Sequence, residues 1–243
     1  MPSPTRPVEP VARRGVGRPA QISRQAIAEA AHEIGLGNVT LKAVADRLGV
    51  SVAGLYHHIR GKDDLLLLAA EHSASRIELP LDHGQHWAVW LAEWATYNVD
   101  AFVAEPQLLH QFLAGAISPE SIAGTTDAIL GLLVRQGFSI AEAHAAYQLT
   151  SSCALGAAVK ATREATARAA GRSEVSDQHQ VLDRHSRDEL PYLRRLLALL
   201  VTEQPDSFRT SLTTALAGVA VTRGEPWEPV AAMVDEVLAA RRR

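Results

Sequence analysis

The sequence predicts an all-α protein in which a small N-terminal unit of three helices precedes a larger helical domain. Apolar residues recur at the three- and four-residue spacing of a helix along most of the chain, and no stretch shows the alternation typical of a strand. Prolines stand near the expected starts of helices and glycines near their ends, which is the usual asymmetry of helix termini. These observations favour helices throughout.

The composition limits the class of protein. The chain has 243 residues, of which 47% are hydrophobic, enough to bury a substantial core. A single cysteine, Cys153, excludes an intrachain disulfide and fits a reducing compartment. The N-terminus lacks the apolar segment of a secretory signal, and the longest apolar run, 65–70, is too short to span a membrane. We therefore expect a soluble, cytoplasmic protein with no membrane partner.

The charge is unevenly distributed along the chain. Residues 1–65 carry nine Arg and Lys against six Asp and Glu, a net charge of +3, whereas the remainder carries −6 of the overall −3. A basic N-terminal segment on an otherwise acidic chain is expected where only that segment contacts phosphate groups.

The N-terminal unit is expected over 21–66, after a disordered basic arm at 1–20 that is rich in proline and arginine. Ser23, Thr40 and Ser51 are residue types that cap helix N-termini. They are expected to open three helices that end near residues 36, 48 and 59. Glycines follow each of these ends, which supports the boundaries.

The domain expected over 67–243 is helical almost throughout. A fourth helix over 62–79 enters it, with Asp63 and Asp64 in the first turn, where the helix dipole favours negative charge. The further helices are expected at 85–104, 106–114, 119–136, 139–169, 190–201, 206–222 and 228–240. The stretch 171–188 is polar with few apolar residues, and we expect a loop there.

The segment 40–66, TLKAVADRLGVSVAGLYHHIRGKDDLL, is the most informative. Two short helices joined by a tight turn need a small residue in the first helix and a glycine in the turn, and Ala45 and Gly49 have that spacing. Apolar residues supply the interior: Val44, Leu48, Val50 and Leu55. The pattern is typical of a helix-turn-helix, whose second helix enters the DNA major groove. A plain helical hairpin shows the same spacing and stays an alternative.

The residues that follow resemble a known family. Leu55, Tyr56, His58, Lys62 and the Leu65–Leu66 pair match the signature L-Y-x-H-F/V-x-x-K-x-x-L-L of the tetracycline-repressor (TetR) family. The preceding segment also matches, through Thr40, Val44, Ala45, Gly49, Val50 and Ser51. Ile59 departs mildly, since an aromatic residue or valine is usual there. The resemblance covers about residues 22–70 and implies a helix-turn-helix regulator whose ligand domain follows.

The resemblance implies roles for residues of this segment. Tyr56, Lys62 and Thr40 are expected to contact DNA phosphates. The exposed face of the third helix is expected to read bases, with Lys42 reaching a guanine edge. The expected interface comprises Arg18, Thr40, Lys42, Ser51, Val52, Ala53, Gly54, Tyr56, His57 and Lys62. His58 is expected to be structural. Arg13, Arg14 and Arg18 lie in the minor groove or along phosphates if the arm binds DNA, and otherwise belong to a solvated tail.

Three of the four tryptophans, with a tyrosine, form a stripe on one helix face. Trp87, Trp90, Trp94 and Tyr97 follow one another at steps of three, four and three residues. Such a stripe is either the wall of a binding pocket or packed core, and both readings stay open. The candidate ligand-binding residues are His86, Trp87, Trp90, Trp94, Tyr97, Asn98, Phe102, His110, Phe112, His144, Tyr147 and Gln148. Their apolar bias predicts a lipophilic or aromatic ligand.

Small residues at helical spacing occur in 139–169 and 206–222, including Gly156 and Gly218. By resemblance to the family, these two helices are expected to pair with those of a second subunit in a four-helix bundle. Such a homodimer presents two recognition helices about 34–36 Å apart to a palindromic double-stranded operator. The family's usual activity is repression. We expect a small-molecule effector to release DNA by favouring a conformation with wrong spacing, mainly by moving the fourth helix.

Two other classes of function were weighed. An enzyme is disfavoured because the chain lacks G-x-S-x-G and a P-loop, and its only G-x-G, at 15–17, follows no strand. His83 and His86 have metal-like spacing, but only Asp82 stands near them, so neither a metal nor a cofactor is expected. The second alternative is a helical interaction module without DNA binding, which the retained tyrosine, lysine and histidine oppose.

Overall fold

The computed structural model describes residues 22–203 and 205–241; the expected arm at 1–20, with Arg18, lies outside the described residues. The described part of the chain is helical and contains no strand, which confirms the predicted fold class. Its helices are α1 (Arg24–Ile34), α2 (Leu41–Leu48), α3 (Val52–Leu55), α4 (Lys62–Ser75), α5 (Trp87–Ala104), α6 (Pro106–Leu113), α7 (Pro119–Arg135), α8 (Ile140–Ala169), α9 (Glu174–Leu182), α10 (Pro191–Thr202), α11 (Ser207–Thr222) and α12 (Trp227–Ala240).

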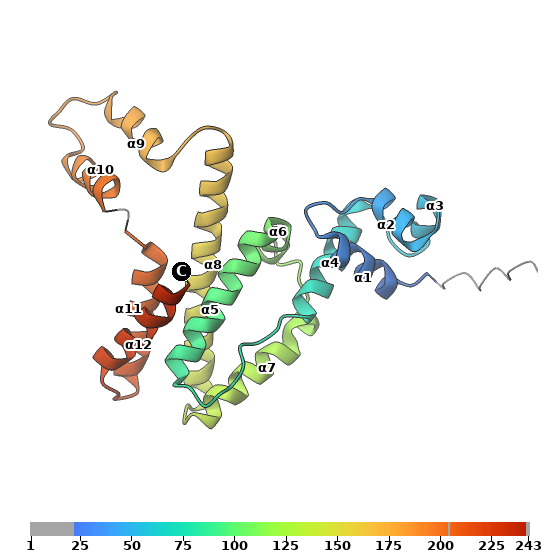
Figure 1. Cartoon of the computed structure of the whole chain (residues 1–243), viewed down its shortest axis with the longest axis horizontal. Coiled ribbons are helices and arrows are strands. Elements are labelled where there is room, and N and C mark those ends of the chain that lie inside the picture. Colours follow the sequence, from blue (N-terminus) through green and yellow to red (C-terminus); the bar gives the residue numbers. More distant parts are fainter. Residues whose placement is uncertain (1–21, 204, 242–243) are drawn as a thin grey trace, which may run out of the picture.

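Helices α1 to α3, with the first turn of α4, form a small unit at one end of the molecule, here called the head (Figure 1). The expected caps are present: Ser23, Thr40 and Ser51 each accept a hydrogen bond from the backbone N–H three residues on, at 3.0–3.1 Å. The apolar faces close over one core that includes Ile27, Val44, Leu55 and Ile59. The head is therefore assembled as the capping and apolar patterns predicted.

Helix α4 connects the head to the rest of the chain, here called the body. It packs against α1 on the head side and against α6 and α7 on the body side (Figure 1). The head core also takes in four body residues, Phe102, Leu108, Leu109 and Ala158. Apolar packing is therefore continuous from the head into the body.

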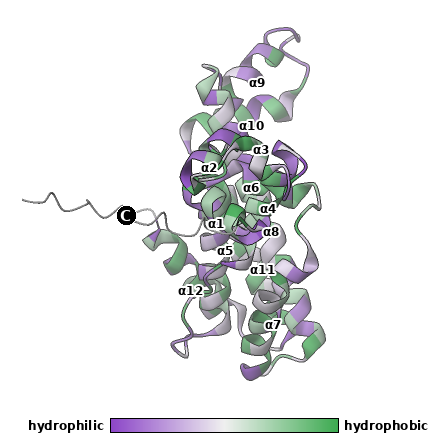
Figure 2. Cartoon of the chain, turned by 90° about the vertical axis from the view of Figure 1, so that its right-hand side faces the viewer, coloured by the Kyte–Doolittle hydropathy of each residue, from purple (hydrophilic) through white to green (hydrophobic). Residues whose placement is uncertain are grey.

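The body is built around α5, which packs against α8, α12 and α6. Its core contains the buried faces of α5, α7, α8, α11 and α12. Individual helices carry both hydrophobic and hydrophilic residues, as expected where each buries one face (Figure 2). Helices α9 and α10 pair with each other and extend away from the other body helices (Figure 1).

Three sequence-based expectations are corrected. The stretch 171–188 is not all loop, because α9 forms within it. Ser173 and Ser176 make a reciprocal capping box there, and the acidic residues Glu174 and Asp177 lie in the first turn, so local capping starts a helix that the apolar pattern did not indicate.

The third and fourth helices are shorter than expected. Regular α-helix ends at Leu55 rather than near residue 59, because the backbone N–H groups of His57 and His58 bond three residues back, which tightens the turn. Helix α4 ends at Ser75 rather than near 79. Beyond it the chain continues without helix to Pro80, and Ile77 packs against the body core. Among the described residues, no helix is long and apolar enough to cross a membrane.

Candidate DNA interface and effector region

The turn between α2 and α3 sets the direction of the recognition segment. Gly49 has φ of 68°, in the left-handed region that favours glycine, and its N–H bonds back to α2. The N–H of Val50 donates to the carbonyl of Ala45 at 3.0 Å, and Ala45 itself is buried. The small residue and the glycine thus allow the steep packing that a helix-turn-helix requires.

The residues predicted to contact DNA lie on the head, and the structure brings them into one region. Exposed are Thr40, Lys42, Ser51, Ala53, Tyr56, His57 and Lys62, and half-buried are Val52 and Gly54. The Tyr56 side chain is 53% exposed although its neighbour Leu55 is fully buried. This arrangement places the Tyr56 ring and hydroxyl on the outside of a packed turn.

A cluster around Asp64 was missed by sequence reasoning, which assigned Asp64 only to the dipole of α4. The Arg24 guanidinium donates to both carboxylate oxygens of Asp64 at 3.0 and 3.2 Å, and to the carbonyl of His58 at 2.6 Å. The backbone N–H of Arg60 donates to Asp64 at 2.9 Å. The Arg24 hydrogen bond, followed by that of Arg60, lowers the pKa of Asp64 and keeps it ionised.

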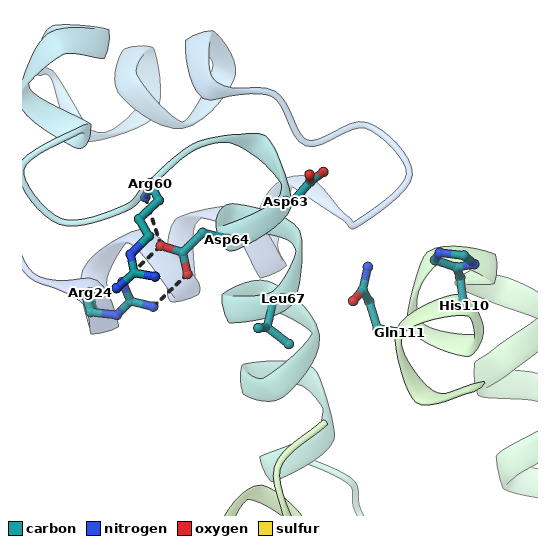
Figure 3. Close-up of a pocket in the computed structure, with 7 residues that line it drawn as sticks. All are labelled: Arg24, Arg60, Asp63, Asp64, Leu67, His110 and Gln111. Atoms are coloured by element: carbon teal, nitrogen blue, oxygen red, sulfur yellow. Dashed lines mark hydrogen bonds and ion pairs between the residues drawn. The ribbon is translucent and has the colours of Figure 1, made fainter. Parts of the chain in front are cut away.

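This cluster borders a cleft of about 750 Å³ between head and body. Figure 3 shows Arg24, Arg60 and Asp64 on one side, with His110 and Gln111 of α6 on the other. His110, predicted to bind ligand inside the body, is therefore an exposed residue of this cleft.

The tryptophan stripe lies in the body core. Trp87, Trp90 and Trp94 are at most 3% exposed. Trp90 and Trp94 stack with ring centroids 6.3 Å apart, and Trp94 stacks on Tyr97 at 6.2 Å. The two readings of the stripe are therefore distinguished by its polar atoms rather than by its burial.

The indole N–H groups of the stripe differ in their partners. That of Trp87 donates to Glu225 at 2.9 Å, and that of Trp90 donates to the carbonyl of Pro80 at 3.0 Å. The Trp94 N–H is buried and has no hydrogen-bond partner within the described residues. A buried donor without an acceptor costs free energy, so Trp94 is the tryptophan of the stripe whose N–H is left unsatisfied.

The other predicted ligand residues are dispersed. Asn98 donates to the carbonyl of Trp94 at 2.8 Å, and Tyr147 packs against the body core. Phe102 belongs to the head-side core and contacts Phe112 with ring centroids 5.4 Å apart. His144 and Gln148 are exposed on α8. The structure thus gathers the tryptophans with His86, Tyr97, Asn98 and Tyr147, and leaves Phe102, His110, Phe112, His144 and Gln148 apart.

His86 lies at the start of α5 in a network with Glu225 and Arg223. Its imidazole accepts from the N–H of Ala88, and its other ring nitrogen is 3.7 Å from Glu225. Burial lowers the pKa of His86, partly opposed by the charge of Glu225. Arg223 bonds Glu225 at 2.7 Å and lies 3.6 Å above the Phe138 ring. The network joins the ends of α5, α7 and α11, which indicates a structural role.

Asp82, near His83 and His86, instead accepts from the N–H of Gly84 and pairs with Arg135 at 3.5 Å. Across residues 22–203 and 205–241, no group of three or more His, Cys, Asp or Glu side chains is placed to hold a metal ion.

Comparisons with known proteins identify the family. Residues 24–69 match the family described as bacterial regulatory proteins, tetR family, and residues 79–223 match the tetracyclin repressor-like C-terminal domain. Together these matches span head and body. The chain belongs to the TetR family of helix-turn-helix, DNA-binding transcriptional regulators.

Individual relatives are more distant. An HTH-type transcriptional regulator of Saccharopolyspora erythraea is 28% identical over 130 residues, which are 50% of this chain and 52% of that protein. The chain thus aligns with about half the length of this relative. The TetR family protein ActR of Streptomyces coelicolor, solved in complex with actinorhodin, is 22% identical with a TM-score of 0.62, over 85% of this chain and 100% of ActR. ActR without ligand gives 21% identity and the same TM-score and coverage. These likenesses show the shared fold.

Proposed function

We propose that this chain is a repressor that binds a palindromic operator as a homodimer and leaves it when a small lipophilic or aromatic molecule binds the body. The observation that carries the proposal is the head surface, where Tyr56, His57 and Lys62 are exposed around a closed apolar core. A tyrosine hydroxyl and a lysine ammonium at the start of α4 suit phosphate oxygens, and the exposed side of α3 suits base edges. Binding to bacterial DNA places the protein in the cytoplasm.

The effector is proposed to bind beside Trp94. The buried, unpartnered indole N–H supports an acceptor atom on the effector, and the stacked rings of Trp90 and Tyr97 support a flat apolar body. ActR, of the same fold, has been solved in complex with actinorhodin, which supports a small-molecule ligand for a body of this kind. No protein-bound cofactor is part of the proposal.

The homodimer is proposed to form through α8 and α11. Both helices expose small residues, Gly156 and Ser152 on α8 and Gly218 on α11, and a methyl group added at either glycine meets no other atom within 4 Å. Leu149 on α8 and Val221 on α11 are also exposed. Small residues beside exposed apolar ones allow close helix approach across a two-fold axis.

Fluorescence anisotropy tests the DNA-binding part. The labelled duplex is the region upstream of the gene that encodes the chain, with a scrambled duplex as control, at several salt concentrations. Selective binding that weakens steeply with salt is expected. Lys62→Ala is expected to weaken binding to both duplexes and to reduce the salt slope by about one, whereas Arg187→Ala, exposed between α9 and α10, leaves it unchanged.

Other results would point to other functions. If both duplexes bind equally and weakly, the operator lies elsewhere, and selection from a random-sequence library is the way to find it. No binding to any DNA, or a salt-insensitive complex with a protein, favours the interaction module. Turnover of a compound that releases the DNA favours an enzyme.

A further inference from the structure

Three segments of the head meet at one carboxylate. Arg24 is the first residue of α1, His58 and Arg60 lie in the turn after α3, and Asp64 lies in the first turn of α4. Figure 3 shows that Arg24 bonds both oxygens of Asp64 and that the N–H of Arg60 bonds Asp64 as well. Arg24 also donates to the carbonyl of His58. We call this set of four hydrogen bonds the Asp64 clamp.

The clamp restrains the orientation of the three segments that it joins. A guanidinium is planar, so an arginine that holds two carboxylate oxygens and a carbonyl together restrains all three groups in position. Asp64 is only 19% exposed, so its bonds are partly shielded from water. The turn after α3 and the start of α4 are therefore held at a set angle to each other and to α1.

The residues proposed to contact phosphate flank this clamp. Tyr56 precedes His58 by two residues, and Lys62 precedes Asp64 by two. Neither takes part in the clamp, but both are attached to backbone that the clamp restrains. We infer that Arg24 and Asp64 are positioning residues for DNA binding, which hold Tyr56 and Lys62 at the spacing of adjacent phosphates before DNA arrives. This inference rests on the proposed phosphate contacts.

A purely stabilising role accounts less well for the clamp. The head core is closed without it, since Leu55, Ile59 and Leu65 are buried by apolar contacts. The Arg24 side chain is 51% exposed, so solvent weakens its contribution to stability. A second, more exposed ion pair of the head, Arg47 with Glu33, joins α2 to α1. This pair therefore serves as a control for the loss of one negative charge from the head.

The decisive test compares Asp64→Asn with Glu33→Gln in the full-length chain. The probe is a duplex that the wild-type chain selects from a random-sequence library. Each variant removes one negative charge from the head, so long-range electrostatics alone predicts equal or slightly tighter binding for both. The clamp instead predicts that the two variants differ. Asp64→Asn is expected to weaken binding roughly tenfold, the loss of about one charge-assisted contact, while Glu33→Gln stays within about twofold of the wild type.

Two further variants separate positioning from folding. Arg24→Lys keeps the charge but cannot hold three acceptors in one plane, so it is expected to weaken binding as Asp64→Asn does. The double variant Asp64→Asn with Lys62→Ala is expected to lose less than the product of the two single losses, because Asp64 acts partly through Lys62. Circular dichroism and anisotropy are measured well below the melting transition of each variant.

The outcomes are distinct. The inference is supported if Asp64→Asn and Arg24→Lys are folded and bind DNA more weakly than the wild type. It also requires that the losses of affinity from Asp64→Asn and Lys62→Ala do not multiply in the double variant. Wild-type affinity in these variants, or losses that multiply with Lys62→Ala, overturns it while leaving the proposed function in place. If the wild type selects no sequence, the proposed function fails and the inference fails with it.

Discussion

Trp90 and Trp94 provide a matched pair for testing how the body core uses its indole groups. Both lie on α5, both are almost fully buried, and their rings stack. Replacing either by phenylalanine removes similar ring volume, so the cavity cost is shared and cancels in the comparison. The two variants differ mainly in the hydrogen bond.

The difference can be worked out from the contacts. Trp90→Phe leaves the Pro80 carbonyl without the N–H that it accepts at 3.0 Å, which costs at least about 1 kcal/mol. Trp94→Phe removes a buried donor that has no partner in the described structure, which relieves at least about 1 kcal/mol. Trp94→Phe is therefore expected to be less destabilising than Trp90→Phe by about 2 kcal/mol, close to 30-fold in the folding equilibrium.

Urea unfolding followed by far-ultraviolet circular dichroism measures this difference. Protein concentration is kept equal across variants because the stability of a dimer depends on it. Trp87→Phe serves as a control with a satisfied donor, and is expected to be more destabilising than Trp94→Phe because Glu225 loses the N–H that it accepts at 2.9 Å, although Arg223 still bonds this carboxylate. If Trp94→Phe proves as destabilising as Trp90→Phe, with equal denaturant slopes, the view of Trp94 as an unpartnered donor is wrong.

Three further predictions concern the head and α4. Tyr56→Phe keeps the ring and removes the hydroxyl, so DNA binding measured by anisotropy should weaken by about 1–2 kcal/mol with an unchanged circular dichroism spectrum; unchanged affinity removes Tyr56 from the contacts. Burial, followed by Arg76 and His32, lowers the pKa of His72 from its ordinary 6.5, so the unfolded chain binds more protons and stability falls as pH drops below about 6.5. The urea midpoint of the wild type should fall as the pH is lowered, and that of His72→Gln should fall less. An equal fall in both proteins would contradict the assignment. Gly49→Ala must hold a side chain at φ of 68°, which should cost about 1–2 kcal/mol in urea unfolding although the added methyl group meets nothing; wild-type stability would show that the turn can relax.

Local signals in the sequence predicted much of the fold. Caps such as Ser23 and Thr40 act on backbone groups three residues away, so the residue types alone indicated where helices begin. The same rule locates α9 through Ser173 and Ser176, but the polar composition of that stretch was given more weight than its capping residues. The error came from giving apolar periodicity precedence over capping in that stretch.

The sites depend on contacts that no local pattern contains. Arg24 and Asp64 are 40 residues apart, and Trp87 and Glu225 are 138 residues apart. One sequence cannot pair such residues, because many arginines and glutamates are equally available to each partner. A candidate head interface could be proposed from one short segment because a family signature lies there, whereas the effector region draws on helices distant in sequence.

The tryptophan stripe shows where periodicity stops being informative. A pocket wall and a packed core both need apolar side chains on one helix face, so steps of three and four residues fit either. A pocket wall and a packed core differ in whether the polar atoms of the stripe have hydrogen-bond partners within the protein. A core tryptophan gives its N–H to protein, as Trp87 and Trp90 do, whereas a pocket tryptophan keeps its donor for a ligand. Trp94 alone of the three has that property within the described chain. A compound that releases DNA by accepting this hydrogen bond should lose potency against Trp94→Phe and keep it against Trp90→Phe, while the DNA affinity of both variants without compound stays that of the wild type. Equal loss in both would mean that the effector recognises the shape of the stripe and not its one open donor.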